Sequence, residues 1–391
     1  MKILFLSQRV PYPPNRGDKI TTWRIIERLR RHHEVVCVAF AHDQADRDGA
    51  RELERMGFPI HTVDLHPKWS RVKSLPLLLT SKPLTLGVFG STELQRLVDE
   101  HAEGADLAYA FSSSMGAFLL PHAGLRRVMH FAELDSDKWH QYVERTKPPM
   151  KWIYAREWKT LLAFERDIAH KVETNVFCTA LEQDIFEQEI PGAPSHVMRN
   201  GVDLEYYQPA PEQAEPGHIV FTGVMDYFPN VDGCQWFANE ILPEVRKQVP
   251  EVRFTIVGSH PTPEVEALAA LPGVSVTGFV DDTRDYLRKA ALSVAPLRIA
   301  RGIQNKVLEA LAMGLPVIGT TCATQGTGGT ADGHFMVEDT REGQIAAVIQ
   351  LLQDRERAAT LARAGRQFVE DNYDWEVTLS VLDEIVSPAK G

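Results

Sequence analysis

Short, uninterrupted apolar runs alternate with helical stretches in two separate blocks of the chain, and this pattern constrains the fold more than any other feature. The first block has such runs at Ile3–Leu6, Val35–Phe40, 107–111 and 126–130. In the second block they are His218–Thr222, Arg253–Val257, Val274–Thr277, Ala291–Ala295 and Pro316–Gly319. Because these runs lack the polar alternation of half-buried strands, they predict parallel sheets with helices on both faces. The expected class is α/β, with two doubly wound, Rossmann-like domains.

Helical spacing fills the intervals between the runs. Apolar residues recur at Ile20, Trp23, Ile26 and Leu29, and residues 150–170 form a longer amphipathic stretch. Further helices are expected at 231–248, 262–271, 281–290 and 305–313. The proline-rich stretch 208–217 is typical of a linker. The first domain is therefore expected over residues 1–195 and the second from residue 196.

Charge and composition exclude several classes of protein. The 391 residues carry a net charge of −11, all of it beyond residue 195, so a nucleic-acid partner is not expected. Cys37, Cys178, Cys234 and Cys322 are too scattered for a disulfide framework or a zinc knuckle. The apolar start MKILFLSQR is too short for a signal-peptide core, and LPLLL is too short to span a bilayer. A cytoplasmic protein is expected.

The segment PLRIARGIQNKVLEALAMGLPVIGT (296–320) carries the most functional information. Its polar loop places Gly302, Ile303, Gln304 and Asn305 at the N-terminus of a helix, where free N–H groups and the helix dipole favour an anion. Lys306 and Glu309 follow, three residues apart on one helix. A cation near phosphate and a carboxylate near ribose would suit a nucleotide sugar. The alternative is a surface Lys–Glu pair without a ligand.

This segment resembles the donor-binding signature of GT-B glycosyltransferases of the retaining family 4. Their pattern is E-G-F-G-x-x-x-L-E-A-M-A-x-G-x-P-V, and Glu309 falls on the second Glu, which in that family holds the ribose. The first Glu, which contacts the transferred sugar, falls on Arg301. PPNRGDK (13–19), RNGVD (199–203), GFVDD (278–282) and FTGVMDYFPNVDG (221–233) resemble other family segments in the same order.

The resemblance implies a GT-B fold, with two domains facing a cleft and residues 372–391 as a helix that crosses back to the first domain. The family's diphosphate-binding Arg and Lys are replaced here by Val224 and, approximately, Asn230. We infer that Lys306 supplies the missing cation. The donor-binding residues implied are Gly17, Gly223, Gly258, Gly278, Phe279, Val280, Gly302, Ile303, Gln304, Asn305, Lys306 and Glu309.

Together, PYPPNRGDKI, ELDSDKW and RGIQNKVLEA look closest to the sugar transferases associated with PEP-CTERM/exosortase loci. The function implied is retaining, metal-independent transfer of a hexose from a UDP- or GDP-sugar in exopolysaccharide biosynthesis, with no cofactor. The acceptor would be a saccharide or a lipid-linked saccharide. A non-catalytic GT-B scaffold and a nucleotide-sugar 2-epimerase of GT-B shape are the alternatives.

The stretch HFAELDSDKW (130–139) holds His130, Glu133, Asp135 and Asp137 directly after a predicted strand. We expect Asp135 and Asp137 on the acceptor side, and either His130 or Asp135 near the reacting hydroxyl. Lys306 and Arg301 complete the predicted catalytic set. The tripeptide Asp135-Ser136-Asp137 could hold a metal ion, but the GT-B pattern disfavours this and no metal is expected. A purely structural alternative is a helix N-cap at Asp135 or Ser136.

Two further features concern cations in the first domain. Arg16 and Lys19, beside Gly17, could meet a phosphate of donor or acceptor, and a plain loop capped at Asp18 is the alternative. The stretches 67–79 and 147–159 interleave tryptophan with Lys and Arg, as segments at membrane interfaces do. Side chains that merely cover a core would give the same pattern. Peripheral contact with the inner membrane surface is therefore one expectation.

Overall fold

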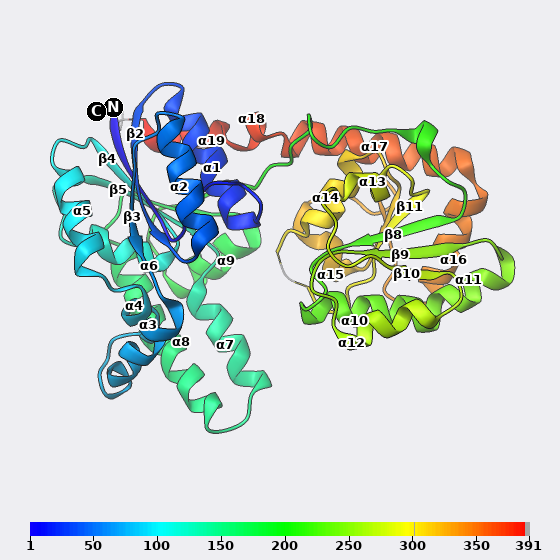
Figure 1. Ribbon diagram of the computed structural model, residues 1–391, viewed down its shortest axis with the longest axis horizontal. Helices are drawn as coiled ribbons and strands as arrows, with labels where there is room; N and C mark the ends of the chain where they lie inside the picture. The colour runs from blue at the N-terminus through cyan, green and yellow to red at the C-terminus, as the bar shows by residue number, and fades with distance from the viewer. Residues whose placement is uncertain (301, 388–391) are drawn as a thin grey trace. The chain divides into compact units, whose positions relative to one another are not determined.

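The computed structural model describes residues 1–300 and 302–387, apart from the side chains of residues 144 and 145. Arg301, one of the predicted catalytic residues, lies outside this description. The chain forms two compact units: Met1–Asn200 together with the segment from Leu379 onward, and Gly201–Thr378 (Figure 1). The proline-rich stretch 208–217, expected to be a linker, belongs to the second unit and contains a short 3-10 turn over Pro211–Gln213.

The first unit is built on a seven-stranded, all-parallel sheet of order β3-β2-β1-β4-β5-β6-β7. The strand order reverses between β1 and β4, and at such a switch point open α/β sheets hold their ligands. The strands are β1 Lys2–Ser7, β2 Glu34–Ala41, β3 Ile60–Asp64, β4 Leu107–Phe111, β5 Arg126–Ala132, β6 Thr174–Phe177 and β7 Ser195–Val197.

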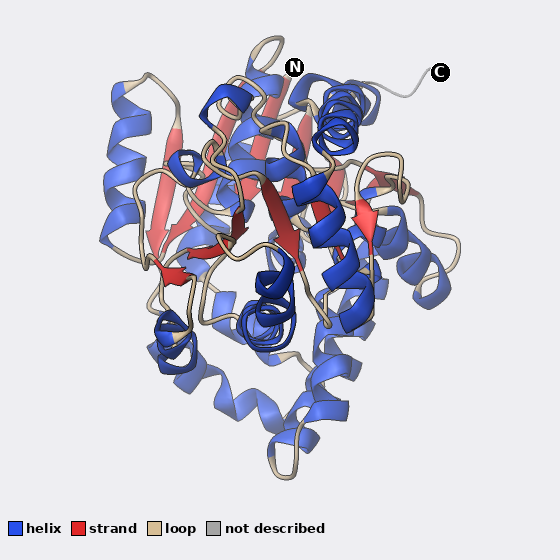
Figure 2. Cartoon of the chain, turned by 90° about the vertical axis from the view of Figure 1, so that its right-hand side faces the viewer, coloured by secondary structure: helices blue, strands red, loops and turns tan. Residues whose placement is uncertain are grey.

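Figure 2 shows helices on either side of the strands, as the unbroken apolar strands require. The helices of the first unit are α1 Gly17–Arg30, α2 Gln44–Arg55, α3 Pro67–Ser74, η1 Leu75–Leu79, α4 Leu84–Phe89, α5 Thr92–Ala102, α6 Ser113–Gly116, η2 Ala117–Leu119, α7 Asp135–Arg145, α8 Met150–Ala169, α9 Ala180–Glu189 and α19 Ser380–Val386. The expected stripe of α1 is confirmed, because Trp23, Ile26 and Leu29 are buried.

The second unit repeats the architecture with a six-stranded parallel sheet of order β10-β9-β8-β11-β12-β13. Its strands are β8 His218–Thr222, β9 Arg253–Val257, β10 Val274–Val276, β11 Leu292–Ala295, β12 Val317–Gly319 and β13 Met336–Val337. Here the strand order reverses between β8 and β11. The two doubly wound sheets of the sequence prediction are confirmed.

The helices of the second unit are η3 Pro211–Gln213, α10 Phe228–Trp236, α11 Leu242–Gln248, α12 Pro263–Glu266, η5 Ala267–Ala270, α13 Arg284–Leu287, α14 Asn305–Ala312, α15 Thr321–Thr324, η6 Gln325–Thr327, α16 Arg341–Gln353, α17 Arg355–Tyr373 and α18 Trp375–Thr378. The single helix expected over 231–248 is instead divided by a π turn, Phe237–Ile241. Pro243, just beyond this turn, has no N–H to continue the usual hydrogen-bond ladder.

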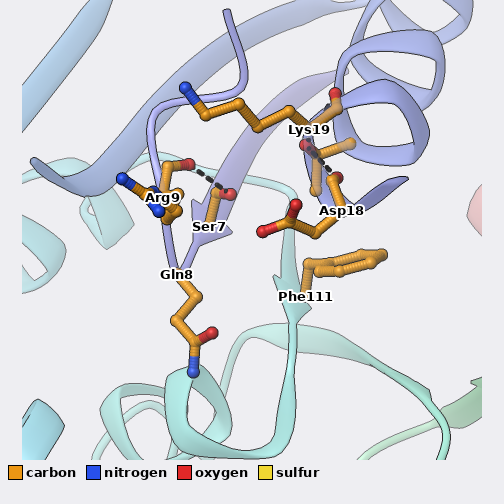
Figure 3. Close-up of a pocket in the computed structure, with 7 residues that line it drawn as sticks. Ser7, Gln8, Arg9, Asp18, Lys19 and Phe111 are labelled. Atoms are coloured by element: carbon orange, nitrogen blue, oxygen red, sulfur yellow. Dashed lines mark hydrogen bonds between the residues drawn. The ribbon is translucent and has the colours of Figure 1, made fainter. Parts of the chain in front are cut away.

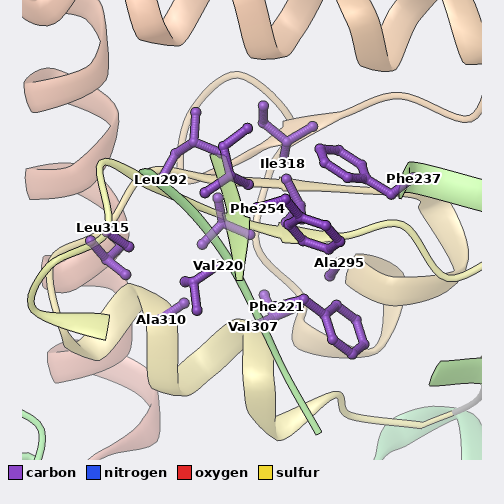
Figure 4. Packing of buried hydrophobic residues seen from close by; sticks show 14 of the residues in the cluster. Val220, Phe221, Phe237, Phe254, Leu292, Ala295, Val307, Ala310, Leu315 and Ile318 are labelled. Carbon is purple, nitrogen blue, oxygen red and sulfur yellow. The ribbon is translucent and has the colours of Figure 1, made fainter. Parts of the chain in front are cut away.

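The core of the second unit fixes the position of α14. Val307 and Ala310 on one face of this helix are buried against the sheet strand that carries Val220 and Phe221 (Figure 4). Because the apolar face of α14 is packed against the sheet, the positions of its first turn and of its polar face are fixed as well. The polar residues Lys306 and Glu309 are therefore held in place by packing elsewhere on the same helix.

The C-terminal segment packs on the first unit. Arg28 of α1 forms an ion pair with Asp383 of α19 at 2.5 Å. The guanidinium of Arg126, at the start of β5, donates hydrogen bonds to the carbonyl oxygens of Ile385 (2.6 Å) and Val386 (2.7 Å). Among the described helices none is long and apolar enough to pass through a bilayer.

Candidate functional site

At the loop after β8, four of the residues singled out in the sequence lie together: Gly223, Val224, Asn230 and Lys306. Asn230, in the first turn of α10, is buried; its amide Nδ2 donates to the carbonyl oxygen of Val224 at 2.8 Å. Its Oδ1 accepts a hydrogen bond from Lys306 Nζ at 2.5 Å. A Cβ on Gly223 would lie 2.7 Å from Asn230 Nδ2 and 3.2 Å from Lys306 Nζ. A side chain at position 223 would therefore push the Asn230 amide or the Lys306 ammonium out of its present place.

A second glycine supports this loop from β9. Gly258 has φ +154, and a Cβ there would lie 1.6 Å from the carbonyl oxygen of Gly223. The two predicted donor-site glycines thus touch each other through their backbones. Only residues without a side chain allow the ends of β8 and β9 to approach so closely.

Lys306 is a half-buried cation at the first turn of α14. Its ammonium lies 4.2 Å from the centroid of the Phe221 ring, within the range of a cation–π contact. Burial lowers the pKa of Lys306 to about 8. Across the described residues, no carboxylate lies within ion-pair distance of this ammonium. The surface Lys–Glu pair considered as an alternative is therefore wrong, and the ammonium of Lys306 contacts Phe221 and Asn230 instead.

Glu309 lies one turn further along α14, and burial raises the pKa of its carboxyl group. The side chain of Tyr207 forms a hydrogen bond with this carboxylate. The phenol must be the donor, because an ionised carboxylate only accepts. Tyr207 was not predicted from the sequence, and its distance of about a hundred residues from Glu309 left no local signal.

The loop leading into α14 is held by a close approach of two backbones. Gly302 has φ +67, a conformation that favours glycine, and Gln304 occupies the N-cap position of the helix. A Cβ on Gly326 would lie 2.3 Å from the carbonyl oxygen of Gly302. Gly326, in the glycine-rich loop 325–333, thus packs closely against the backbone of the Gly302 loop. The N–H groups of Val307 and Leu308 donate to the carbonyl oxygen of Gln304, at 2.9 and 3.5 Å. Among the described residues, the N–H groups of Asn305 and Lys306 at the start of α14 have no acceptor and are available to an anion.

The turn after β10 presents an aromatic ring. Phe279 is 75% exposed and follows Gly278, which has φ +70, whereas Val280 packs partly on the core. Nearby, the guanidinium of Arg284 stacks 3.6 Å from the centroid of the Tyr206 ring and is paired with Asp282. This turn therefore offers a flat apolar face beside an ordered polar cluster. Such a surface suits the stacking of a planar ring.

In the first unit, Asp135 begins α7 directly after β5. Its carboxylate accepts a hydrogen bond from the hydroxyl of Ser113. The buried Glu165 of α8 accepts from the backbone N–H of Ser136 at 3.3 Å. Burial raises the pKa of both carboxyl groups, and the proximity of Asp135 further raises that of Glu165. The N-cap alternative for Asp135 or Ser136 is wrong, since Leu134 occupies the cap position.

The remaining acceptor-side candidates lie around this cluster. His130 is fully buried, its Nδ1 is 2.9 Å from the Tyr109 hydroxyl, and burial lowers its pKa to about 3. The imidazole is therefore neutral at physiological pH. Asp137 accepts a hydrogen bond from Gln141 at 2.8 Å in the first turn of α7. Within the described residues, no three His, Cys, Asp or Glu side chains are grouped to hold a metal ion.

A small pocket lies in the first unit between the ends of β1 and β4 and the start of α1 (Figure 3). Lys19 lines it, and its ammonium lies 2.7 Å from the buried carboxylate of Asp46. Arg9 also pairs with Asp46, at 2.9 Å. Arg16 is exposed and pairs with Asp18 at 2.5 Å, and Gly17 opens α1 with free space at its Cβ position. The cap considered at Asp18 is wrong, because Arg16 occupies that position.

Residues 216–354 match the family model described as Glycosyl transferases group 1. This span runs from just before β8 to the end of α16, and it contains the Gly223 loop, Lys306 and Glu309. All of the matched residues lie within the second unit.

Two curated relatives match parts of the chain. A glycogen synthase of Mycobacterium tuberculosis is 24% identical over 257 residues, which cover 61% of this chain and 60% of the synthase. A GDP-mannose-dependent alpha-(1-6)-phosphatidylinositol monomannoside mannosyltransferase of Mycolicibacterium smegmatis is 30% identical over 166 residues, or 37% of this chain and 42% of the relative. The chain thus aligns with about three fifths of the synthase's length and less than half of the mannosyltransferase's.

The whole architecture has solved counterparts. The structure of Anabaena HepE in complex with UDP matches with a TM-score of 0.69 and 17% identity, covering 99% of each chain. The fold is that of GT-B glycosyltransferases. The residues that match the group 1 model therefore lie in the second of the two Rossmann-like units of this fold.

Proposed function

We propose that this chain transfers a hexose from a nucleotide diphosphate sugar to a saccharide or lipid-linked saccharide acceptor. The observation that carries the proposal is the convergence of Lys306, Glu309 and the Gly223 loop within the residues that match the group 1 model. Lys306 offers a positive charge, Glu309 a carboxylate held by Tyr207, and the start of α14 the N–H groups of Asn305 and Lys306. The UDP complex of HepE and the GDP-mannose dependence of the mannosyltransferase support a nucleotide-sugar donor.

In this proposal Lys306 and the N-terminus of α14 bind the diphosphate and stabilise the negative charge that develops on it as it leaves. Glu309 accepts hydrogen bonds from the ribose hydroxyls, and Phe279 stacks on the base. The leaving phosphate oxygen helps deprotonate the acceptor hydroxyl, and the sugar is transferred with retention at its anomeric carbon. The acceptor would approach Asp135 in the first unit. Exopolysaccharide assembly at the inner membrane surface is the proposed setting.

The activity is tested by incubating the purified protein with UDP- and GDP-sugars and following their breakdown. Slow hydrolysis of one donor is the result we expect, because a transferase without acceptor lets water react in its place. Formation of an epimer would instead identify a 2-epimerase. Failure to bind any donor would leave a non-catalytic scaffold.

The same assay is expected to proceed undiminished in EDTA. Lys306 and the helix N-terminus supply the positive charge that a metal ion provides in other transferases. Loss of turnover in EDTA with recovery on adding Mn²⁺ would contradict this. It would then favour a metal held by Asp135 and Asp137.

The pH profile of kcat/KM for the donor is expected to fall as the pH rises through about 8, the pKa of Lys306. Lysine carries its charge below its pKa, so the diphosphate loses its partner at higher pH. The variant Lys306→Arg should lack this alkaline limb, because a guanidinium keeps its proton throughout. An identical alkaline limb in both proteins would assign it to another group.

A further inference from the structure

Two segments of the first unit contain Lys and Arg residues but no Asp or Glu, although Arg156 at the end of the second segment lies 3.7 Å from the carboxylate of Glu157. Residues 65–92 contain Lys68, Arg71, Lys73 and Lys82 but no Asp or Glu, in a chain whose net charge is −11. Residues 146–156 contain Lys147, Lys151 and Arg156, again with no Asp or Glu. The first segment contains α3, η1, α4 and the first residue of α5, and the second contains the first turns of α8.

The same segments expose large apolar side chains. Leu79 is 93% exposed, Trp69 is 69% exposed and Trp152 is 68% exposed. Val72, Leu75 and Met150 are exposed as well. Trp69 and Val72 are three residues apart on α3, so they share one face of the helix. Because these side chains are exposed, they do not pack on a core. The alternative that these segments merely cover a buried core is therefore excluded for them.

Arg156 and Glu157 of α8 join the two segments into one surface. The guanidinium of Arg156 donates to the carbonyl oxygens of Leu77 (2.5 Å), Thr80 (2.5 Å) and Lys82 (2.9 Å). The buried carboxylate of Glu157 accepts from the backbone N–H groups of Leu84 (2.7 Å) and Thr85 (2.8 Å). Trp152 lies one turn before Arg156 and so shares its face of α8. Figure 1 shows α3, α4 and α8 together at the lower end of the first unit.

This basic aromatic surface also has a defined place relative to the sheet. Helix α3 follows the carboxyl end of β3, and α7, which pairs with α8, follows the carboxyl end of β5. Because all strands are parallel, both helices leave from the same edge of the sheet. Asp135, the first residue of α7, lies at this edge too.

We propose that the basic aromatic surface docks on a bilayer containing anionic lipids. It consists of the exposed side chains of Trp69, Val72, Leu75, Leu79, Met150 and Trp152 and the cations Lys68, Arg71, Lys73, Lys82, Lys147 and Lys151. Tryptophan rings and leucine enter the headgroup boundary, while lysine and arginine attract anionic headgroups. A symmetric dimer through this surface would oppose cation to cation, which disfavours a second copy as the occupant.

Docking here would bring a lipid-linked acceptor to the edge where Asp135 lies. That consequence rests on the proposed function, whereas the lipid binding itself does not. A binding measurement therefore separates the two, since a failed donor assay leaves the vesicle result intact.

The test is cosedimentation of the full chain with vesicles of phosphatidylcholine alone and of phosphatidylcholine mixed with phosphatidylglycerol. The wild type should bind the mixed vesicles at least about tenfold more strongly, and high salt should weaken this binding. The triple variant Lys68→Glu/Lys73→Glu/Lys151→Glu should lose about tenfold or more. A second triple variant, Trp69→Ser/Leu79→Ser/Trp152→Ser, should bind more weakly than the wild type. The binding that remains should still decrease at high salt.

The charge-matched control is Arg51→Glu/Arg55→Glu/Lys247→Glu, which reverses three exposed cations outside the surface. It should bind within about twofold of the wild type, and all variants should keep the wild-type rate of donor hydrolysis. Equal binding of the wild type to both kinds of vesicle would overturn the proposal. So would a control variant that loses as much vesicle binding as the first triple variant. Self-association abolished by the first variant, without vesicle binding, would also overturn it and assign the surface to a second copy.

Discussion

Replacing Lys306 with alanine is expected to lower the turnover number about 10²-fold or more. This is the scale seen when one donor that stabilises a developing negative charge is removed. The diphosphate gains charge in the transition state, so the cation matters more to turnover than to ground-state binding. Val224 and Asn230 provide no charge, and the dipole of α14 supplies only about half an elementary charge. Steady-state rates of the purified variant measure the effect.

Two further variants separate charge from packing at this position. Lys306→Met keeps an apolar stem beside Phe221 but removes the charge, and it should be as slow as the alanine variant. Lys306→Arg should recover part of the rate. Lys247→Ala, which removes an exposed lysine on α11, is the matched control and should keep full activity. Near-normal turnover in Lys306→Met would show that this ammonium does not stabilise the leaving group.

Replacing Glu309 with alanine is expected to weaken nucleotide binding by about 1.5–3 kcal/mol, the range for a hydrogen bond to a charged group. This corresponds to roughly 10- to 150-fold in the dissociation constant. The loss should appear for the free nucleoside diphosphate as well as for the donor sugar, because the contact is to the ribose. Calorimetric titration of UDP and GDP measures it directly.

Tyr207→Phe provides a graded test of the same contact. It removes the hydroxyl that holds the Glu309 carboxylate and should weaken nucleotide binding less than Glu309→Ala does. Glu342→Ala, at an exposed carboxylate on α16, should leave the affinity unchanged. Unchanged affinity in Glu309→Ala, with the fold intact by its melting temperature, would remove this residue from the donor site.

The central strands could be predicted from the sequence because strands buried on both faces are continuous apolar runs. His218–Thr222 and Arg253–Val257 agree with the structure to the residue. The strands β3, β6, β7 and β13 were missed. β7 and β13 have only three and two residues, and β3, with the sequence IHTVD, mixes polar and apolar side chains. Edge and near-edge strands need fewer apolar residues, so their sequences carry a weaker signal.

The site was predictable only where it lies on one segment. Lys306 and Glu309 stand on a single helix, and their spacing was visible in the sequence. Their partners Phe221, Asn230 and Tyr207 come from distant parts of the chain, and only folding brings them together. Lys19 illustrates the same limit, because Asp46, which is buried beside its ammonium, lies on the following helix.

A crystal structure of this chain with bound UDP or GDP tests the central claim most directly. The account predicts the diphosphate at the first turn of α14, with a phosphate oxygen about 3 Å from Lys306 Nζ. It also predicts the ribose hydroxyls on the carboxylate of Glu309 and the base against Phe279. A nucleotide bound away from α14, with Lys306 still bonded only to Asn230, would contradict it.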